Sequence, residues 1–271
     1  MKSYRPILLL LLAAAITGPS TALFARDQAP FVLQVHPIFT PPQAELVYQP
    51  LVDYLNEATE YRFVLQTTPD FHTYWFDIRR GQQPDFVLED AHLIALRMER
   101  DGFIPLARAD EPATFSLLTT DAMVTEPEEL IGRRIATMPA PSLGYLVLAS
   151  WYPNPMQQPV LDSGAASWLD AVEIVFDAEA DAAIVPHNLV RRYVNLTPVI
   201  TSAEFPHQTL ASSPEIPVAV RNSVTDALLE LDEQPEHFGA LHELDIQAFV
   251  SADPDEYLGL ENWLELIFSD F

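Results

Sequence analysis

Short apolar runs alternate with stretches of helical spacing in the first part of the chain. The predicted strands are residues 31–39, 62–67, 86–88 and 103–108. The predicted helices are residues 43–58, 70–80 and 91–100. Pro50 lies inside the first of these helices and is expected to kink or split it. The alternation predicts an α/β sheet with helices on its faces.

A strand at residues 114–120 breaks this rhythm and opens a second, smaller α/β unit. Its further predicted strands are residues 133–138, 160–161 and 182–185. Its predicted helices are residues 142–151, 167–176 and 188–194. Residues 198–212 read as extended, and residues 223–271 read as helical with breaks at Pro235 and Pro254. We therefore expect two lobes joined by two crossing strands, around a cleft that closes by hinge motion.

The N-terminus has the pattern of a secretory signal peptide. Lys2 and Arg5 precede an apolar run over residues 7–16, and small residues follow up to Ala25. An uncleaved membrane anchor is the alternative, but the run is short for a span of about 20 residues. We predict a signal peptide at residues 1–25 and a periplasmic protein. The first lobe is then expected at residues 26–115 and 205–271, and the second at residues 116–204.

The charge of the chain is strongly negative. It has 14 Lys and Arg against 39 Asp and Glu, a formal net charge of −25, and Lys2 is its only lysine. Such a surface repels nucleic acid and anionic membranes. It is typical of proteins that stay soluble in high salt, with cation binding as the alternative reading. The chain has no cysteine, which excludes disulfides and a lipid-anchoring cysteine.

No motif indicates an enzyme or a cofactor. The chain has no Gly-x-Ser-x-Gly, no Gly-x-Gly-x-x-Gly and no His-Glu-x-x-His. His36 and His187 lie near predicted strand ends, but no third ligand at readable spacing completes a metal site. We expect no catalytic residues, no metal and no cofactor. The segment MPAPSLGYL, residues 138–146, joins a strand to a helix, and such a junction presents amide groups to an anion.

Five stretches resemble, in order, the phosphonate-type periplasmic substrate-binding proteins of ABC importers. They are YQPLVDYLNEATEYRFVLQTTPDF, PDFVLEDAHLIAL, EELIGRRIATMPAPSLGYL, EADAAIV and FVSADPDEYLGLENW. The resemblance covers nearly all of the chain beyond the signal peptide. It implies a two-lobed type II periplasmic binding protein fold, in which each lobe is a mixed sheet flanked by helices and two hinge strands join the lobes. It also implies a monomer that binds a small molecule without turnover, for an ABC permease or, alternatively, a membrane sensor.

The resemblance places a ligand at the start of the helix at residues 142–151. Family members often carry a Ser-Thr-Ser-Gly run there, which holds a phosphonate, whereas this chain has Pro141, Ser142, Leu143 and Gly144, followed by Tyr145. Only Ser142 keeps a hydroxyl, and Pro141 has no N–H to donate. The ligand is therefore open between a phosphonate- or phosphate-like anion and a cationic or neutral molecule.

Other ligand-binding positions follow from the same resemblance. Phe71 matches an aromatic residue after the second strand, and Glu89 matches a tyrosine after the third. Trp168 falls near a histidine of the second lobe, and Asn188 and Gln208 fall near acidic residues that hold an amino group in some members. Trp168 can instead fill the core. Asp90 precedes a predicted helix and is expected to cap it.

Overall fold

The computed structural model describes residues 29–268. The predicted signal peptide and its cleavage site lie outside these described residues. Within residues 29–268, no helix combines the length and the apolar character that a membrane span requires.

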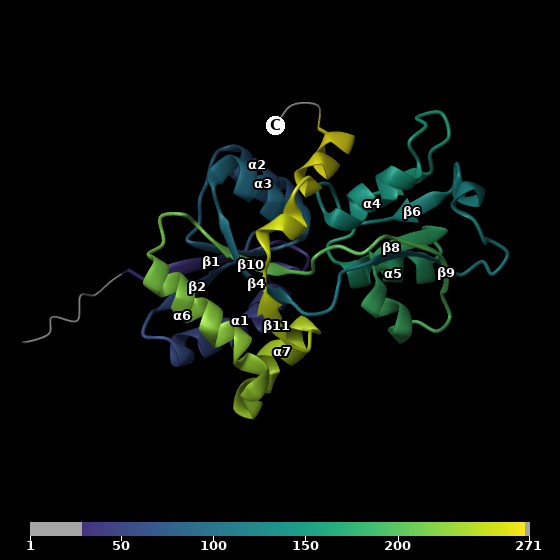
Figure 1. Cartoon of the computed structure of the whole chain (residues 1–271). Helices are drawn as coiled ribbons and strands as arrows, with labels where there is room; N and C mark the ends of the chain where they lie inside the picture. The colour runs from purple at the N-terminus through teal and green to yellow at the C-terminus, as the bar shows by residue number, and fades with distance from the viewer. Residues whose placement is uncertain (1–28, 269–271) are drawn as a thin grey trace, which may run out of the picture.

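Six strands form the sheet of the first half of the molecule. They are β1 (Phe31–Val35), β2 (Phe63–Gln66), β3 (Phe86–Glu89), β4 (Ile104–Ala109), β10 (Thr209–Ser212) and β11 (Phe249–Ser251). Their order is β11-β4-β10-β3-β1-β2. β1 runs parallel to β2 and β3, whereas β10 runs antiparallel to β3 and β4. We call this sheet, with its helices, lobe 1 (Figure 1).

Helices cover both faces of the lobe 1 sheet. They are α1 (Pro41–Ala58), α2 (Phe71–Arg79), α3 (Ala91–Asp101), α6 (Val218–Leu229) and α7 (Phe238–Leu244). Apolar side chains of α1, α6 and α7 form one core with the sheet, while α2 and α3 belong to other clusters. α1 is one helix through Pro50, so the predicted split is wrong. The carbonyl that Pro50 leaves unpaired belongs to Leu46, which is exposed, and buried Tyr48 and Leu51 hold the helix on either side.

Five strands form the sheet of the second half, which we call lobe 2. They are β5 (Phe115–Thr119), β6 (Arg134–Ala136), β7 (Val160–Asp162), β8 (Ala182–Pro186) and β9 (Thr197–Thr201). Their order is β7-β6-β8-β5-β9, with β6 parallel to its neighbours and β5 antiparallel to its own. Its helical segments are η1 (Pro127–Leu130), α4 (Leu143–Trp151), α5 (Trp168–Phe176) and the 3-10 turn η2 (His187–Arg192). The expected class, two mixed sheets flanked by helices, is confirmed.

Two chain segments join the lobes. Residues 110–114 lead from β4 to β5, and residues 202–208 lead back from β9 to β10. They run antiparallel at Ala113 and Phe205, whose amides and carbonyls exchange two hydrogen bonds of 2.9 Å. These are the two hinge strands that the family resemblance implies.

The C-terminal part was predicted to be all helical, which is wrong. β11 is a strand at the edge of the lobe 1 sheet, where Phe249 lies opposite Ala109. The α-helices α6 and α7 also lie in this part, and its other helical segments are the 3-10 turns η3 (Leu231–Glu233), η4 (Pro235–His237), η5 (Pro254–Tyr257) and η6 (Leu260–Leu266). The backbone N–H and C=O groups at the edge of β4 pair with β11. Because this partner is far away in the chain, the local sequence of three residues does not predict the strand.

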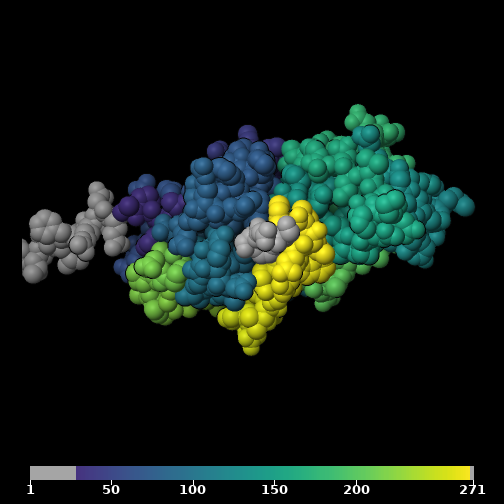
Figure 2. All heavy atoms as spheres, turned by 90° about the horizontal axis from the view of Figure 1, so that it is seen from above, coloured from purple at the N-terminus to yellow at the C-terminus, as the bar shows by residue number. Residues whose placement is uncertain are grey.

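The last of these turns lies in the seam between the lobes (Figures 1 and 2). Leu264 in η6 is fully buried, and the Trp263 ring contacts Phe205 edge-on with ring centres 5.2 Å apart. Beyond η6, Phe268 stacks on Trp75 of α2 at 4.8 Å. One hydrophobic core therefore extends from α2 and α3 of lobe 1 into α4 and the sheet of lobe 2.

A buried ion pair lies inside lobe 1. Glu89 at the end of β3 and Arg97 of α3 are both fully buried, with the Arg97 Nε 2.8 Å and Nη2 2.7 Å from Glu89 Oε1. The Tyr74 hydroxyl of α2 donates to the same carboxylate. Burial alone would lower the pKa of Arg97, but the Glu89 carboxylate more than offsets this and raises it.

Removing one partner of this pair should destabilise the fold strongly. Arg97→Met leaves the Glu89 charge buried without a cation, so we expect the free energy of unfolding to fall by about 3–5 kcal/mol. The Glu89→Met, Arg97→Met double variant should recover most of that loss. Urea denaturation of the three proteins measures it.

Arg100→Met is the matched control. Arg100 lies on the same helix and pairs with Asp101, but its side chain is partly exposed, so the loss should stay below about 1 kcal/mol. An equal loss for Arg97→Met and Arg100→Met would contradict the role of the buried pair.

Candidate functional site

Strand ends of lobe 1 bring four polar residues to one edge of its sheet. His36 follows β1, Asp90 follows β3, and His207 and Gln208 precede β10. Because β10 is antiparallel to β3, with Thr209 opposite Glu89, the start of one strand lies beside the end of the other. Ligands of open α/β sheets bind at such carboxyl ends.

The facing edge of lobe 2 is built in the same way. His187 and Asn188 follow β8, and Phe115 begins β5 opposite Pro186 of β8. Trp168 opens α5, and Ser167 caps that helix by accepting a hydrogen bond from the Asp170 amide. Because its ring packs edge-on against Phe115 at 5.6 Å, Trp168 forms an aromatic wall at this edge.

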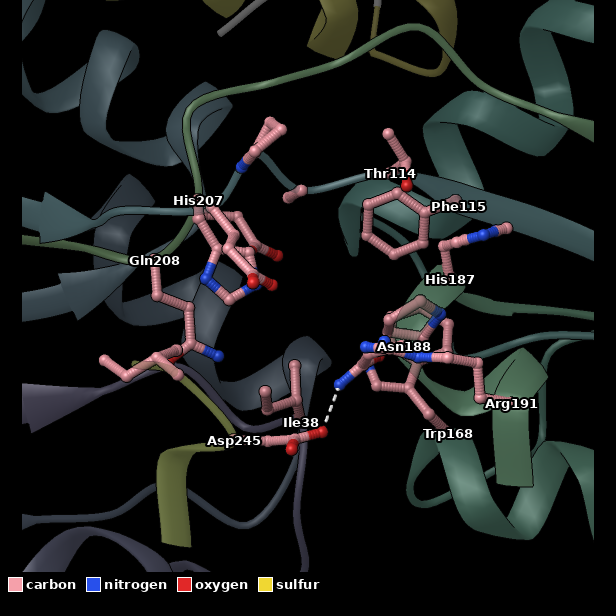
Figure 3. A pocket seen from close by; sticks show the side chains of 16 residues that line it. Ile38, Thr114, Phe115, Trp168, His187, Asn188, Arg191, His207, Gln208 and Asp245 are labelled. Carbon is pink, nitrogen blue, oxygen red and sulfur yellow. Dashed lines mark hydrogen bonds between the residues drawn. The ribbon is translucent and has the colours of Figure 1, made fainter. Parts of the chain in front are cut away.

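These two edges enclose a pocket between the lobes. Figure 3 shows Ile38, His207, Gln208 and Asp245 on the lobe 1 side, with Thr114, Phe115, Trp168 and Asn188 opposite them. A second hollow continues along Ile38, Trp168 and Asn188. The pocket thus has an apolar wall and polar groups from both lobes, as small-molecule sites usually do.

Hydrogen bonds from Asn188 and Arg192 to Asp245 connect the two sides of the pocket, and we call this group the Asp245 clasp. Asp245, directly after α7, accepts hydrogen bonds from the Asn188 Nδ2 at 2.7 Å and from the Arg192 guanidinium at 3.0 Å. Asp245 adopts the left-handed conformation, with φ of 57°. The clasp links lobe 1 to the η2 turn of lobe 2.

Asp90 is the buried carboxylate of the pocket, with 8% of its surface exposed. It stands at the cap position of α3, but no helix amide donates to its side chain, so the predicted cap is wrong. Its carboxylate instead lies 3.5 Å from the His36 Nδ1. Burial alone would raise the pKa of Asp90, but His36, and then His92 and His207, attract the carboxylate and lower it. Burial lowers the pKa of both His92 and His207.

Polar groups at the start of α4 are hydrogen-bonded within the chain. Ser142 is fully buried; it accepts a hydrogen bond from the Tyr145 amide and gives its own amide to the Pro139 carbonyl. The His92 Nε2 of lobe 1 lies 2.8 Å from the Pro141 carbonyl. Leu143 is fully buried in the core. Two of the amides that could hold an anion are therefore paired within the chain.

Trp168 packs closely against Gly144 in the first turn of this helix. A Cβ added at Gly144 would lie 2.5 Å from Trp168 Cη2 and 3.1 Å from the Phe115 ring. Only glycine permits this approach. Trp168 is 6% exposed, so it packs in the core and lines the pocket at the same time.

The predicted ligand residues therefore fall into two groups. Trp168 and Asn188 line the pocket. Phe71, Glu89, Ser142, Leu143, Gly144 and Tyr145 do not line the pocket. Phe71 is in the core beside His36, and Glu89 faces Arg97. Sequence reasoning missed Asp245, which has no local signal, and gave no role to His207.

A Ser–His pair near the pocket is structural. The Ser116 Oγ lies 2.6 Å from His187 Nδ1 and 2.9 Å from the Thr201 hydroxyl. Ser116 is fully buried on β5, where no substrate can reach its oxygen. The pair holds the η2 turn to the sheet.

Comparisons with known proteins agree with this architecture. A family model described as "ABC transporter, phosphonate, periplasmic substrate-binding protein" matches residues 33–257. No curated protein sequence matches the chain. PhnD1 from Prochlorococcus marinus, in complex with methylphosphonate, has a similar structure at 12% identity and a TM-score of 0.71, over 86% of this chain and 96% of that one.

Two further solved structures are similar. A binding protein component of an ABC phosphonate transporter from Pseudomonas aeruginosa has 15% identity and a TM-score of 0.72, over 88% of this chain and 86% of that one. XAC2383 from Xanthomonas citri, bound to ATP, has 19% identity and a TM-score of 0.68, over 87% and 96%. At these identities the likeness shows the fold. The family model establishes that the chain belongs to the phosphonate-type periplasmic substrate-binding proteins of ABC transporters.

Adding a methyl group at Gly144 should strain the contact with Trp168. Alanine favours a helix over glycine by about 1 kcal/mol, but overpacking costs about 1–3 kcal/mol. We therefore expect Gly144→Ala to destabilise the protein and to shift its tryptophan fluorescence. Adding Trp168→Leu should make the alanine neutral or stabilising. Gly239→Ala, where a Cβ has no neighbour within 4 Å, is the control. Equal effects at both glycines would contradict the contact.

The buried histidines should make stability depend on pH. Their folded pKa values lie below the ordinary value of 6.5, so the unfolded chain binds more protons as the pH falls through 6.5. The stability they contribute is complete above that pH and declines below it. We expect unfolding experiments at pH 7.5 and 5.5 to show this decline, reduced in His92→Gln and unchanged in His72→Gln, which is exposed. An identical decline in both variants would rule out His92 as a source.

Proposed function

We propose that this chain captures one small molecule in the pocket between its lobes and delivers it to an ABC permease. The observation that carries the proposal is the pocket itself, in which lobe 1 supplies His207 and Gln208 and lobe 2 supplies Trp168 and Asn188. A ligand held by both lobes stabilises the closed arrangement relative to the open one. The family to which the chain belongs consists of such substrate-binding proteins.

Among the predicted site residues, Trp168 and Asn188 are proposed as ligand contacts. Trp168 packs against the body of the ligand, and Asn188 offers an amide beside it. Ser142, Leu143, Gly144 and Tyr145 are proposed as a packed helix start, because Ser142 accepts from the Tyr145 amide, Leu143 is buried and Gly144 lies against Trp168. Phe71 and Glu89 are proposed to support lobe 1 from within.

The setting of this activity follows from the family and from the N-terminal segment. We propose that the chain is exported through a cleaved signal peptide and acts in the periplasm as a monomer. Binding and release are then the whole biochemical act, without turnover. The negative charge of the chain, −25, excludes nucleic acid as the partner.

A thermal-shift screen tests the proposal. The panel contains phosphonates, phosphate, phosphite, sulfonates, amino acids, polyamines and sugars. A ligand present at about a thousand times its dissociation constant adds roughly 4 kcal/mol of stability, which raises the melting temperature by on the order of ten degrees. We expect at least one class of compound to do so.

Variants locate the site of any shift. Gln208→Ala removes a half-buried pocket group and should reduce the shift, whereas Asn222→Ala on the exposed side of α6 should keep it. A ligand that stabilises both variants equally would place binding elsewhere. A flat screen across the panel would count against a solute-binding role.

A further inference from the structure

Asp90 places a buried carboxylate at the wall of the pocket. Neither the α3 amides nor any arginine of the described residues reaches it. A buried charge is costly unless it is paired. The neighbouring Glu89 is paired with the Arg97 guanidinium at 2.7 Å, whereas the Asp90 carboxylate lies 3.5 Å from the His36 Nδ1.

Two further polar atoms of the same pocket have no hydrogen-bond partner within the described residues. The Asn188 Nδ2 donates to the Asp245 carboxylate, which fixes the orientation of the amide, and the Asn188 Oδ1 is then buried without a donor. The His207 Nδ1 is likewise buried without a hydrogen-bond partner. Because burial lowers the pKa of His207, its ring is neutral at pH 7 and one of its nitrogens accepts.

Three further charged residues line the pocket, namely Glu111, Asp245 and Arg191. Glu111 accepts a hydrogen bond from the Gln247 side chain, and Asp245 is held by Arg192. Arg191 also lines the pocket, but it is exposed, so water screens its charge. Opposite these groups, the Trp168 ring offers a face on which a cation or an alkyl chain packs favourably.

We infer that the pocket takes a small organic molecule with a primary ammonium group, bound with that group toward Asp90. This inference rests on the proposed function and names its substrate class. An ammonium brings a positive charge and three N–H donors, which suit the Asp90 carboxylate, the open Asn188 Oδ1 and an accepting nitrogen of His207. The net charge of −25 steers such a cation to the protein and repels free anions.

Matched probes in isothermal titration calorimetry at pH 7 test the inference. The ammonium probes are ethanolamine and putrescine. Choline keeps the positive charge without N–H donors, and ethylphosphonate is an anion without an amine. We expect the ammonium probes to bind, choline to bind at least about tenfold more weakly because the hydrogen bonds to a charged group are lost, and ethylphosphonate not to bind.

Variants of the carboxylate complete the test. Asp90→Asn keeps the shape of the side chain and removes its charge, so the affinity for the ammonium probes should fall by about tenfold or more. Glu204→Gln, an exposed change in the hinge segment, should leave it unchanged. If Asp90→Asn does not fold, Asn188→Ala supplies the second readout, because losing the open Oδ1 acceptor should lower the affinity for the ammonium probes.

The outcomes separate this inference from the proposed function. Binding of ethylphosphonate but not of ethanolamine or putrescine overturns the inference and leaves the proposed function intact. Equal affinity of Asp90→Asn and the unchanged protein for the ammonium probes also overturns it. Failure of all probes here, together with a flat screen across the wider panel, overturns both.

Discussion

A hydrophobic core shared by both lobes is the constraint on which the rest of the structure depends. It joins Trp75 of α2 and Leu93 of α3 to α4 and to Leu264 of η6. Pulling the lobes apart along this seam would expose such side chains at about 1.5–3 kcal/mol each. Hydrogen bonds also join the lobes, at the paired hinge strands, between Asn188 and Asp245, and between the His92 ring and the Pro141 carbonyl.

Two neighbouring carboxylates at the end of β3, Glu89 and Asp90, have different surroundings. Side chains alternate along a strand, so Glu89 and Asp90 leave the sheet in different directions. Glu89 enters lobe 1 and is neutralised by Arg97 and Tyr74. Asp90 reaches the pocket edge, among imidazoles whose pKa values burial has lowered. One charge is neutralised inside lobe 1, and the other lies at the wall of the pocket.

Sequence patterns predicted the parts of the structure that depend on residues close together in the chain. Apolar periodicity reports burial, so the α/β class and the order of most elements follow from it, as does the Asp70 cap of α2. The edge strand β11 is set by unpaired groups of β4, far away in the chain. For the pocket, the family resemblance indicated Trp168 and Asn188. It could not show that the Glu89 carboxylate is paired with Arg97 inside lobe 1. Asp245 contacts Asn188, which lies 57 residues earlier in the chain. No sequence motif predicts the left-handed backbone conformation of Asp245.

Trp168 links the changed helix start to the new pocket. Its ring lies against Gly144 in the first turn of α4. The same side chain lines the pocket beside Phe115. The scaffold of the family is kept, while the chemistry of its cleft is set by a few side chains at the strand ends.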